Sequence, residues 1–150
     1  MVIKVYTDGA CSNNGKKNAK AGIGVYFSPD DERNYSGRIK GKQTNNVAEI
    51  EALIKAYKIL KKEIENGEKV VFYSDSMYAI RAAGEYGKKN DEKGWEKEIP
   101  NKKLVKKIFS LFQGKKNIEI KYIKAHMGKK NQDSLGNECA DFLAVKSLDA

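Results

Sequence analysis

VYTDGAC, residues 5–11, is the stretch that decides the fold, because it carries an apolar run into a carboxylate at Asp8 and a glycine at Gly9. The run begins at Val2 and alternates β-branched and aromatic residues, with Lys4 as the only charge before Asp8, which predicts a strand. We expect this strand to end at Asp8, and Gly9 to let the backbone turn away from an open site. Asp8 is then either an ordinary turn residue on the surface or part of a site that binds a cation.

The segments that follow predict a mixed α/β sheet with helices packed on it. Two further strands joined by short turns indicate an antiparallel meander, at residues 21–27 and 33–41. Apolar residues then recur every three or four positions, which predicts a helix over residues 46–64. The remaining predicted elements are a buried strand at 70–75, helices at 76–87 and 99–114, a strand at 117–126, and a last helix at 137–148 capped by Asn137 or Ser134. This order of elements fits a single domain over residues 1–150.

The composition indicates a small basic protein whose partner is a polyanion. Lys and Arg number 29 against 20 Asp and Glu, so the 150 residues carry a formal net charge of +9. A lysine-rich surface that only keeps the protein soluble is the alternative. No apolar stretch is long enough to span a membrane and no apolar leader precedes the first strand, so we expect a soluble, cytoplasmic protein. Cys11 and Cys139 lack the spacing of a metal site or a disulfide framework, and we expect reduced thiols.

Two aspartates are expected at the same end of the sheet. Asp8 ends the first predicted strand, and Asp75 ends the strand that follows the long helix. Because a crossover helix joins parallel strands, both carboxylates should emerge at the carboxyl end of the sheet, where α/β proteins bind ligands. Either one alone could be a turn residue, but their coincidence favours a site.

Two helical carboxylates are candidates to join them. Glu49 lies on the flank of the predicted buried face of the long helix, beside small residues, whereas Glu51 shares its face with lysines and should point to solvent. Asp141 lies on a mostly apolar flank of the last helix. The alternative for Asp141 is that it only responds to the helix dipole from the first turn.

Four carboxylates in such semi-buried positions would repel one another. At ~4 Å each pair costs about 1 to 4 kcal/mol at effective dielectric constants between about 80 and 20, so a cation must offset the repulsion. Sites made of oxygen ligands prefer hard ions such as Mg²⁺ or Mn²⁺. A carboxylate cluster on a basic protein therefore predicts metal-assisted phosphodiester hydrolysis, with two ions about 3.5–4 Å apart.

The sequence resembles ribonuclease H of type 1 in four motifs that span Val2 to about Ala144: YTDGAC, QTNNVAEIEAL, YSDSMYAI and KAHMG…GNECADFLA. The resemblance implies a ribonuclease H-like fold, in which a mixed five-stranded sheet of three antiparallel strands and then parallel strands carries helices on both faces. It also implies that two Mg²⁺ ions, or Mn²⁺, support cleavage of the RNA strand of an RNA–DNA hybrid, giving 5′-phosphate and 3′-hydroxyl ends. By motif position the catalytic and metal-binding residues are Asp8, Glu49, Asp75 and Asp141.

The same resemblance implies residues that assist the reaction and read the RNA. The matching histidine, His126, would assist proton transfer or product release, although a lone loop histidine can also be an exposed bystander. Contact with the 2′-hydroxyl distinguishes RNA from DNA, and the matching asparagines in the minor groove are Asn14, Asn45 and Asn46. An alternative use of this segment is helix capping by Thr44 or Asn45.

Further substrate contacts follow by resemblance. Lys42, Thr44 and Asn101 resemble the pocket that holds a phosphate of the DNA strand, and Trp95 would either stack on a sugar or pack a loop. Unlike the best-known members, the segment from Tyr86 to Lys103 is only weakly basic, with six Lys against four acidic residues. Residues 102–116, which overlap the end of that segment, contain six lysines and no acid. We therefore expect the predicted helix at 99–114 to contribute to substrate affinity.

Two other functions are open. A nuclease or resolvase on the same fold would cut DNA, which the asparagines that read the 2′-hydroxyl argue against. A nucleic-acid-binding module with a degenerate site would have lost a carboxylate, and all four are present. We expect a monomer with no obligate protein partner and no separate hybrid-binding domain.

Overall fold

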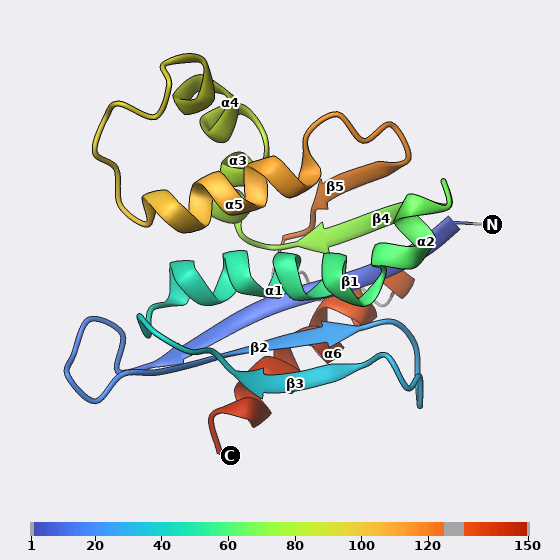
Figure 1. The fold of residues 1–150 in the computed structure, drawn as a ribbon. Helices are drawn as coiled ribbons and strands as arrows, with labels where there is room; N and C mark the ends of the chain where they lie inside the picture. Colours follow the sequence, from blue (N-terminus) through green and yellow to red (C-terminus); the bar gives the residue numbers. More distant parts are fainter. Residues whose placement is uncertain (1, 125–130, 150) are drawn as a thin grey trace.

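Five strands form one mixed sheet in the computed structural model, which describes residues 2–124 and 131–149. The strands are β1 (Val2–Ser12), β2 (Lys20–Tyr26), β3 (Tyr35–Arg38), β4 (Lys69–Ser74) and β5 (Ile118–Tyr122), and their order across the sheet is β3-β2-β1-β4-β5. β1 pairs antiparallel with β2, and β2 antiparallel with β3. β4 lies parallel to both β1 and β5 (Figure 1). The predicted mixed sheet of three antiparallel and then parallel strands is confirmed.

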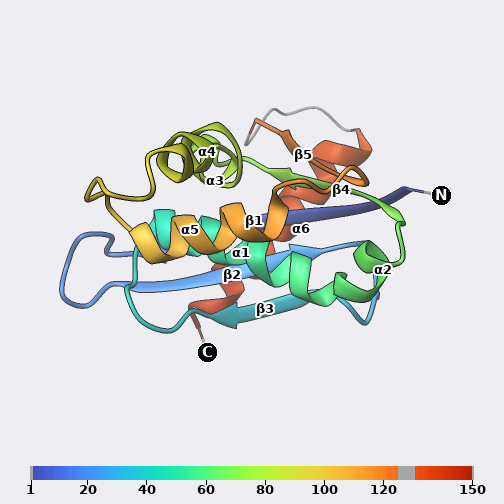
Figure 2. The same ribbon diagram turned by 45° about the horizontal axis from the view of Figure 1, so that its top comes forward.

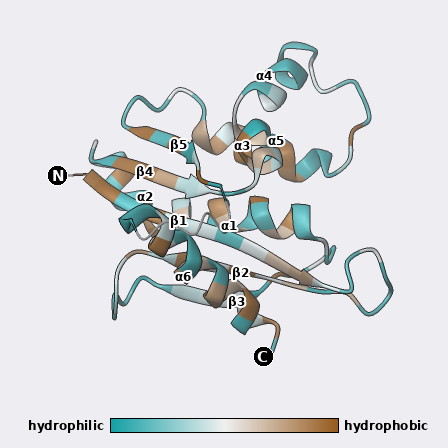
Figure 3. Ribbon diagram, turned by 180° about the vertical axis from the view of Figure 1, so that it is seen from behind, coloured by the Kyte–Doolittle hydropathy of each residue, from teal (hydrophilic) through white to brown (hydrophobic). Residues whose placement is uncertain are grey.

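Helices cover both faces of this sheet, as predicted. They are α1 (Asn45–Ile59), α2 (Lys61–Glu65), α3 (Met77–Ala83), α4 (Glu85–Glu92), α5 (Lys102–Phe112) and α6 (Gln132–Ser147). α1 and α5 lie side by side over one face (Figure 2), and residues of α1, α3 and α5 share one apolar core with β1 and β4. α6 crosses the opposite face over β1, β2 and β3, as the view from behind shows (Figure 3).

The first strand is longer than predicted. It does not end at Asp8, because residues 8–12 continue to pair with β2, from Asp8 opposite Gly24 to Ser12 opposite Lys20. Its pairing with β4 does stop there, at Thr7 opposite Ser74. Asp8 therefore lies inside β1, at the point where the neighbouring strand β4 ends.

Two predicted helices are each divided in two. The helix expected over residues 46–64 breaks at Leu60, which departs from helical geometry with ψ 11° and is fully buried within the main apolar core. The helix expected over residues 76–87 breaks at Gly84, whose ψ of −114° is far from helical. Glycine can adopt that conformation without a side chain to clash.

The last helix begins earlier than predicted. Its N-cap is Asn131, whose side-chain oxygen accepts a hydrogen bond from the Ser134 backbone N–H at 2.8 Å. The predicted caps were wrong, because Ser134 and Asn137 both lie inside α6 and are buried. Asp141 consequently sits in the middle of α6, which removes the alternative of a first-turn response to the helix dipole.

Two apolar layers hold the sheet between its helices. Val5 and Phe72 face α1, α3 and α5, whereas Tyr6 and Tyr73 stack at 4.8 Å on the face covered by α6. Burial of each such side chain contributes about 1.5–3 kcal/mol, so the strands that carry the site are rigidly held. Within residues 2–124 and 131–149, no helix combines the length and apolar character needed to cross a bilayer.

Candidate active site

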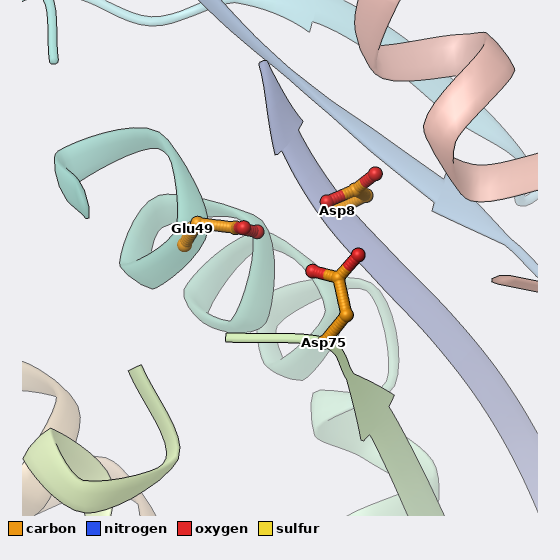
Figure 4. Close-up of side chains that lie close together, drawn as sticks. All are labelled: Asp8, Glu49 and Asp75. Carbon is orange, nitrogen blue, oxygen red and sulfur yellow. The ribbon is translucent and has the colours of Figure 1, made fainter. Parts of the chain in front are cut away.

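Three carboxylates converge at the carboxyl end of the parallel strands. Asp8, Glu49 and Asp75 each place an oxygen atom within 4.8 Å of the others (Figure 4). They come from β1, from the first turns of α1, and from the residue after β4. Asp8 is only 3% exposed and Glu49 only 6% exposed, so two of the three are withdrawn from solvent. The structure thus brings together three of the four carboxylates that the sequence predicted.

The parallel register of β1 and β4 places the two aspartates. Thr7 is opposite Ser74, so Asp8 and Asp75 are the next residues along neighbouring strands. The Thr7 hydroxyl donates a hydrogen bond to the Tyr73 carbonyl oxygen at 2.9 Å, which ties the strands together just before the site. The sequence prediction that both aspartates share one sheet end is confirmed.

Gly9 lets the third carboxylate reach the sheet. A Cβ atom on Gly9 would lie 2.6 Å from the backbone nitrogen of Glu49 and 2.7 Å from the carbonyl carbon of Ala48, so only glycine permits α1 to approach β1 this closely. The Gly9 N–H donates hydrogen bonds to Glu49 Oε1 at 2.8 Å and to Asp8 Oδ1 at 2.9 Å. The predicted turn at Gly9 was wrong. A glycine within an apolar strand is the signal for close backbone approach that would have identified this role.

Crowding of the carboxylates changes their proton affinities. Burial is the main cause that raises the pKa of Asp8 to about 11, and the charges of Glu49 and Asp75 raise it further. Burial and then the charge of Asp75 raise the pKa of Glu49 to about 8, against opposing hydrogen bonds from Asp8 and Gly9. A divalent cation among these oxygens would offset both causes, and the all-oxygen donor set is the kind that Mg²⁺ or Mn²⁺ prefers. The residues present therefore fit such an ion.

Asp141 lies at the flank of this cluster. Its hydrogen bond and its charge both contribute to raising the pKa of Asp8, so the two side chains are close. It is not among the three residues whose oxygens all approach within 4.8 Å, and it remains half-exposed on α6. The Ser36 hydroxyl donates to the Leu143 carbonyl oxygen at 2.6 Å and holds this part of α6 against the sheet. His126 lies outside the described residues.

Comparison with known proteins identifies the family. A sequence model of the family described as RNase H matches residues 1–149. The chain belongs to the RNase H family. Among curated relatives, "Ribonuclease H1" of Mus musculus is 40% identical over 144 residues, covering 93% of this chain and 48% of the relative. "Ribonuclease H" of Ruthia magnifica is 33% identical over 155 residues, covering 98% of this chain and 95% of the relative. The chain thus spans about half the length of the mouse relative.

Solved structures agree with this family assignment. LC11-RNase H1, solved in complex with an RNA/DNA hybrid, is 26% identical with a TM-score of 0.60 and covers 98% of this chain and 96% of its own. The PFV RNase H domain is 24% identical with a TM-score of 0.76, covers 97% of this chain and 93% of its own, and supports the fold alone. An RNase H-like fold is therefore established for this chain.

The asparagine segment that the RNase H resemblance singled out surrounds the start of α1. Thr44 is the N-cap, since its side-chain oxygen accepts the Val47 backbone N–H at 3.2 Å, which decides between the two predicted caps. Asn14 approaches from the loop after β1, and its side-chain oxygen accepts the Asn45 backbone N–H at 3.1 Å. Asn45 and Asn46 are exposed. Capping therefore occupies Thr44 and leaves these asparagine side chains facing solvent.

Lys42 and Asn101 share a surface hollow of about 760 Å³ near the start of α1. Asn101 has a left-handed backbone with φ 57°, and its side-chain amide donates to the Tyr78 hydroxyl at 3.1 Å, which fixes its orientation. Thr44 is not among the residues that line this hollow. The structure thus brings together two of the three residues predicted to hold a DNA phosphate.

Trp95 is placed inside the protein rather than on its surface. It is 8% exposed, its ring packs against Phe109 at 6.5 Å, and its Nε1–H donates to Asp91 Oδ1 at 3.1 Å. This placement favours packing of a loop over stacking on a sugar.

Proposed function

We propose that this chain is an endoribonuclease that hydrolyses the RNA strand of RNA–DNA hybrids. The observation that carries the proposal is the convergence of Asp8, Glu49 and Asp75 at one end of the sheet, with Asp141 beside Asp8. Membership of the RNase H family, relatives named ribonuclease H, and a related structure solved with an RNA/DNA hybrid support it. A net charge of +9 suits a substrate made of phosphates.

Asp8, Glu49, Asp75 and Asp141 would hold two Mg²⁺ ions, with Mn²⁺ as a substitute. Ions held there would activate a water and stabilise the leaving oxygen, chemistry that would give 5′-phosphate and 3′-hydroxyl ends. The chain itself orients the ligands: β1 and β4 fix the two aspartates in register, and the Gly9 N–H holds Glu49 Oε1. His126 would assist proton transfer or product release, as the sequence predicts.

Substrate residues would position the hybrid across this site. Asn14, Asn45 and Asn46 would contact its minor groove, where amide side chains can both donate to and accept from the 2′-hydroxyl. Lys42 and Asn101, in their shared hollow, would hold a phosphate of the DNA strand, with Thr44 as the third predicted contact. We further propose a single domain over residues 1–150 that acts as a cytoplasmic monomer without an obligate protein partner.

A cleavage assay with one labelled RNA strand tests the proposal. The strand is presented alone, paired with RNA and paired with DNA, in Mg²⁺, in Mn²⁺ and in chelator. We expect metal-dependent cutting of the DNA-paired strand only. Binding of the hybrid without cutting in either metal would instead indicate a degenerate binding module, and cutting of a DNA duplex would indicate a DNA nuclease or resolvase.

A further inference from the structure

A basic surface extends from the Lys42–Asn101 hollow over the outer sides of α1 and α5. A second hollow of about 360 Å³ lies beside the first, between α1 and β3, and Lys40 lines both. Figures 1 and 2 show α1 and α5 side by side along this surface. We call the cations that line the two hollows, apart from the Lys42–Asn101 pair and the ion-paired Lys102, the α1–α5 lysine face: Arg38, Lys40, Lys55, Lys58, Lys103 and Lys107.

The centre of this face holds two lysines that repel each other. Lys58 of α1 and Lys107 of α5 are both exposed, and the charge of Lys107 is the main cause that lowers the pKa of Lys58. The charge of Lys55 lowers the pKa further, and the charge of Glu51 raises it. Such a like-charge pair across two helices is relieved by an anion that binds between the two ammonium groups.

Within the part of the chain that the structure describes, these cations form no ion pair. Over the described residues, ion pairs join Lys4 to Asp133, Arg33 to Asp31, Arg81 to Glu85, and Lys102 to Glu98. None of these pairs includes a member of the α1–α5 lysine face. The face is therefore free to attract an external polyanion.

The shape and composition of the face indicate which polyanion fits. Among the described residues, the first hollow is lined by no aromatic ring and the second by Tyr35 alone, and Lys55 Nζ lies 4.3 Å from the centroid of that ring. The face therefore offers lysine charges instead of a ring on which bases could stack. Lysines recognise phosphates as point charges, without base readout. The carboxylates lie at the end of the sheet, whereas this face lies over the outer helices. A duplex is stiff over about 50 nm, so it does not bend from the end of the sheet onto these helices. A single strand is flexible enough to do so.

We propose that the α1–α5 lysine face binds the backbone phosphates of a single-stranded DNA extension that continues from the hybrid past the Lys42–Asn101 hollow. The proposal rests on the proposed function, which places a DNA-strand phosphate in that hollow. From Asn45 to Lys58 the helix advances roughly 20 Å. Even at the stacked duplex spacing of about 3.4 Å per nucleotide, roughly six nucleotides of extension suffice to reach the Lys58–Lys107 pair, and a more extended single strand needs fewer.

The test measures hybrid affinity in chelator, where no cleavage occurs. Four hybrids are compared. One is blunt, two carry a DNA overhang of roughly eight nucleotides, each at a different end, and one carries an RNA overhang of the same length. The variant carries Lys58→Gln and Lys107→Gln. The control carries Lys69→Gln and Lys116→Gln, which remove the same charge from exposed positions at the first residue of β4 and just before β5.

We expect the DNA overhang to tighten wild-type binding roughly tenfold at low salt, and the RNA overhang to add little. The Lys58/Lys107 variant should lose this gain and lower the salt slope by about 1.4, while the control keeps the gain. The proposal is overturned if neither DNA overhang adds affinity, if RNA overhangs add as much, or if both variants lose the gain equally. Cleavage of the blunt hybrid by the wild type in Mg²⁺ is scored separately, so a failure of the nuclease proposal is recognised independently of this binding result.

Discussion

Two groups of like charges occupy this protein at different depths. Asp8, Glu49 and Asp75 meet inside the end of the sheet, where burial adds to their mutual repulsion and strongly raises the pKa of Asp8 and Glu49. Lys58 and Lys107 meet on the outer surface of two helices, where the same kind of repulsion lowers the pKa of Lys58. The difference shows that the burial of a group of like charges determines what their repulsion causes. Buried like charges create a demand for a specific ion, whereas exposed ones create a field that salt screens.

The largest effect should come from removing a buried charge that the reaction needs. Asp8→Asn should lower the cleavage rate of an RNA–DNA hybrid by more than about 10²-fold, because it removes a ligand rather than an outer partner. The control is Asp149→Asn, a change of the same charge at an exposed position of the carboxyl terminus. Rates within tenfold of the wild type for Asp8→Asn would show that the cluster is not the catalytic centre.

Gly9→Ala tests whether the buried group depends on close backbone approach. The added methyl group must displace α1 from β1, so we expect a loss of about 1–3 kcal/mol in the free energy of unfolding together with a large loss of cleavage. Gly67→Ala is the control, since no atom lies within 4 Å of a Cβ there and only its φ of +84° adds strain. Chemical denaturation and cleavage assays measure both effects. Normal cleavage by Gly9→Ala would remove the stated reason for glycine at this position.

The pH dependence of stability in chelator should report the buried group alone. Folding raises the pKa of Asp8 from its ordinary 3.8 to about 11 and that of Glu49 from 4.5 to about 8, so the folded state binds protons more tightly than the unfolded state. Stability from these groups is fully present below about pH 4 and is lost as the pH rises through about 8 for Glu49 and about 11 for Asp8. We expect the wild type to lose at least about 2 kcal/mol between pH 5 and 8 relative to Asp8→Asn. Parallel stability curves for the two proteins would contradict the crowding of the carboxylates.

The smallest effect should come from relieving the exposed repulsion. Lys58→Gln should raise the free energy of unfolding by less than about 0.5 kcal/mol at low salt, and the gain should vanish at high salt. Lys69→Gln, at an exposed position of β4 opposite Val2, should change nothing. Urea denaturation at two salt concentrations measures the difference. If Lys58→Gln stabilised the protein as much as Asp8→Asn does in chelator, repulsion between exposed lysines would be as costly as repulsion between buried carboxylates, contrary to this account.

Local patterns predicted which residues form the buried group, but not how they are held. The order of elements placed Asp8 and Asp75 at one sheet end, and helical periodicity selected Glu49. The continuation of β1 to Ser12 depends on pairing with β2, a non-local contact that residues 9–12 do not reveal. The glycine in that extension was therefore interpreted as a turn.

The helix boundaries show the same limit. Asn131 caps α6 well before the apolar stripe from which the helix was predicted, and Asp133 at its start accepts a hydrogen bond from the Tyr6 hydroxyl at 2.6 Å. That contact joins residues 127 positions apart in the chain, so the local sequence carries no sign of it. The Lys58–Lys107 pair is equally non-local, since it exists only because α5 packs beside α1.

Thermal unfolding of the wild type and of Asp8→Asn, each in chelator and in Mg²⁺, tests most directly whether buried repulsion creates the ion site. We expect Asp8→Asn to melt at a higher temperature than the wild type in chelator, because one of the repelling charges is gone. Mg²⁺ should raise the melting temperature of the wild type and leave that of Asp8→Asn nearly unchanged, since binding to the folded state alone stabilises it. A wild type that is the more stable protein in chelator, and that does not respond to Mg²⁺, would contradict a cation site built from Asp8, Glu49 and Asp75.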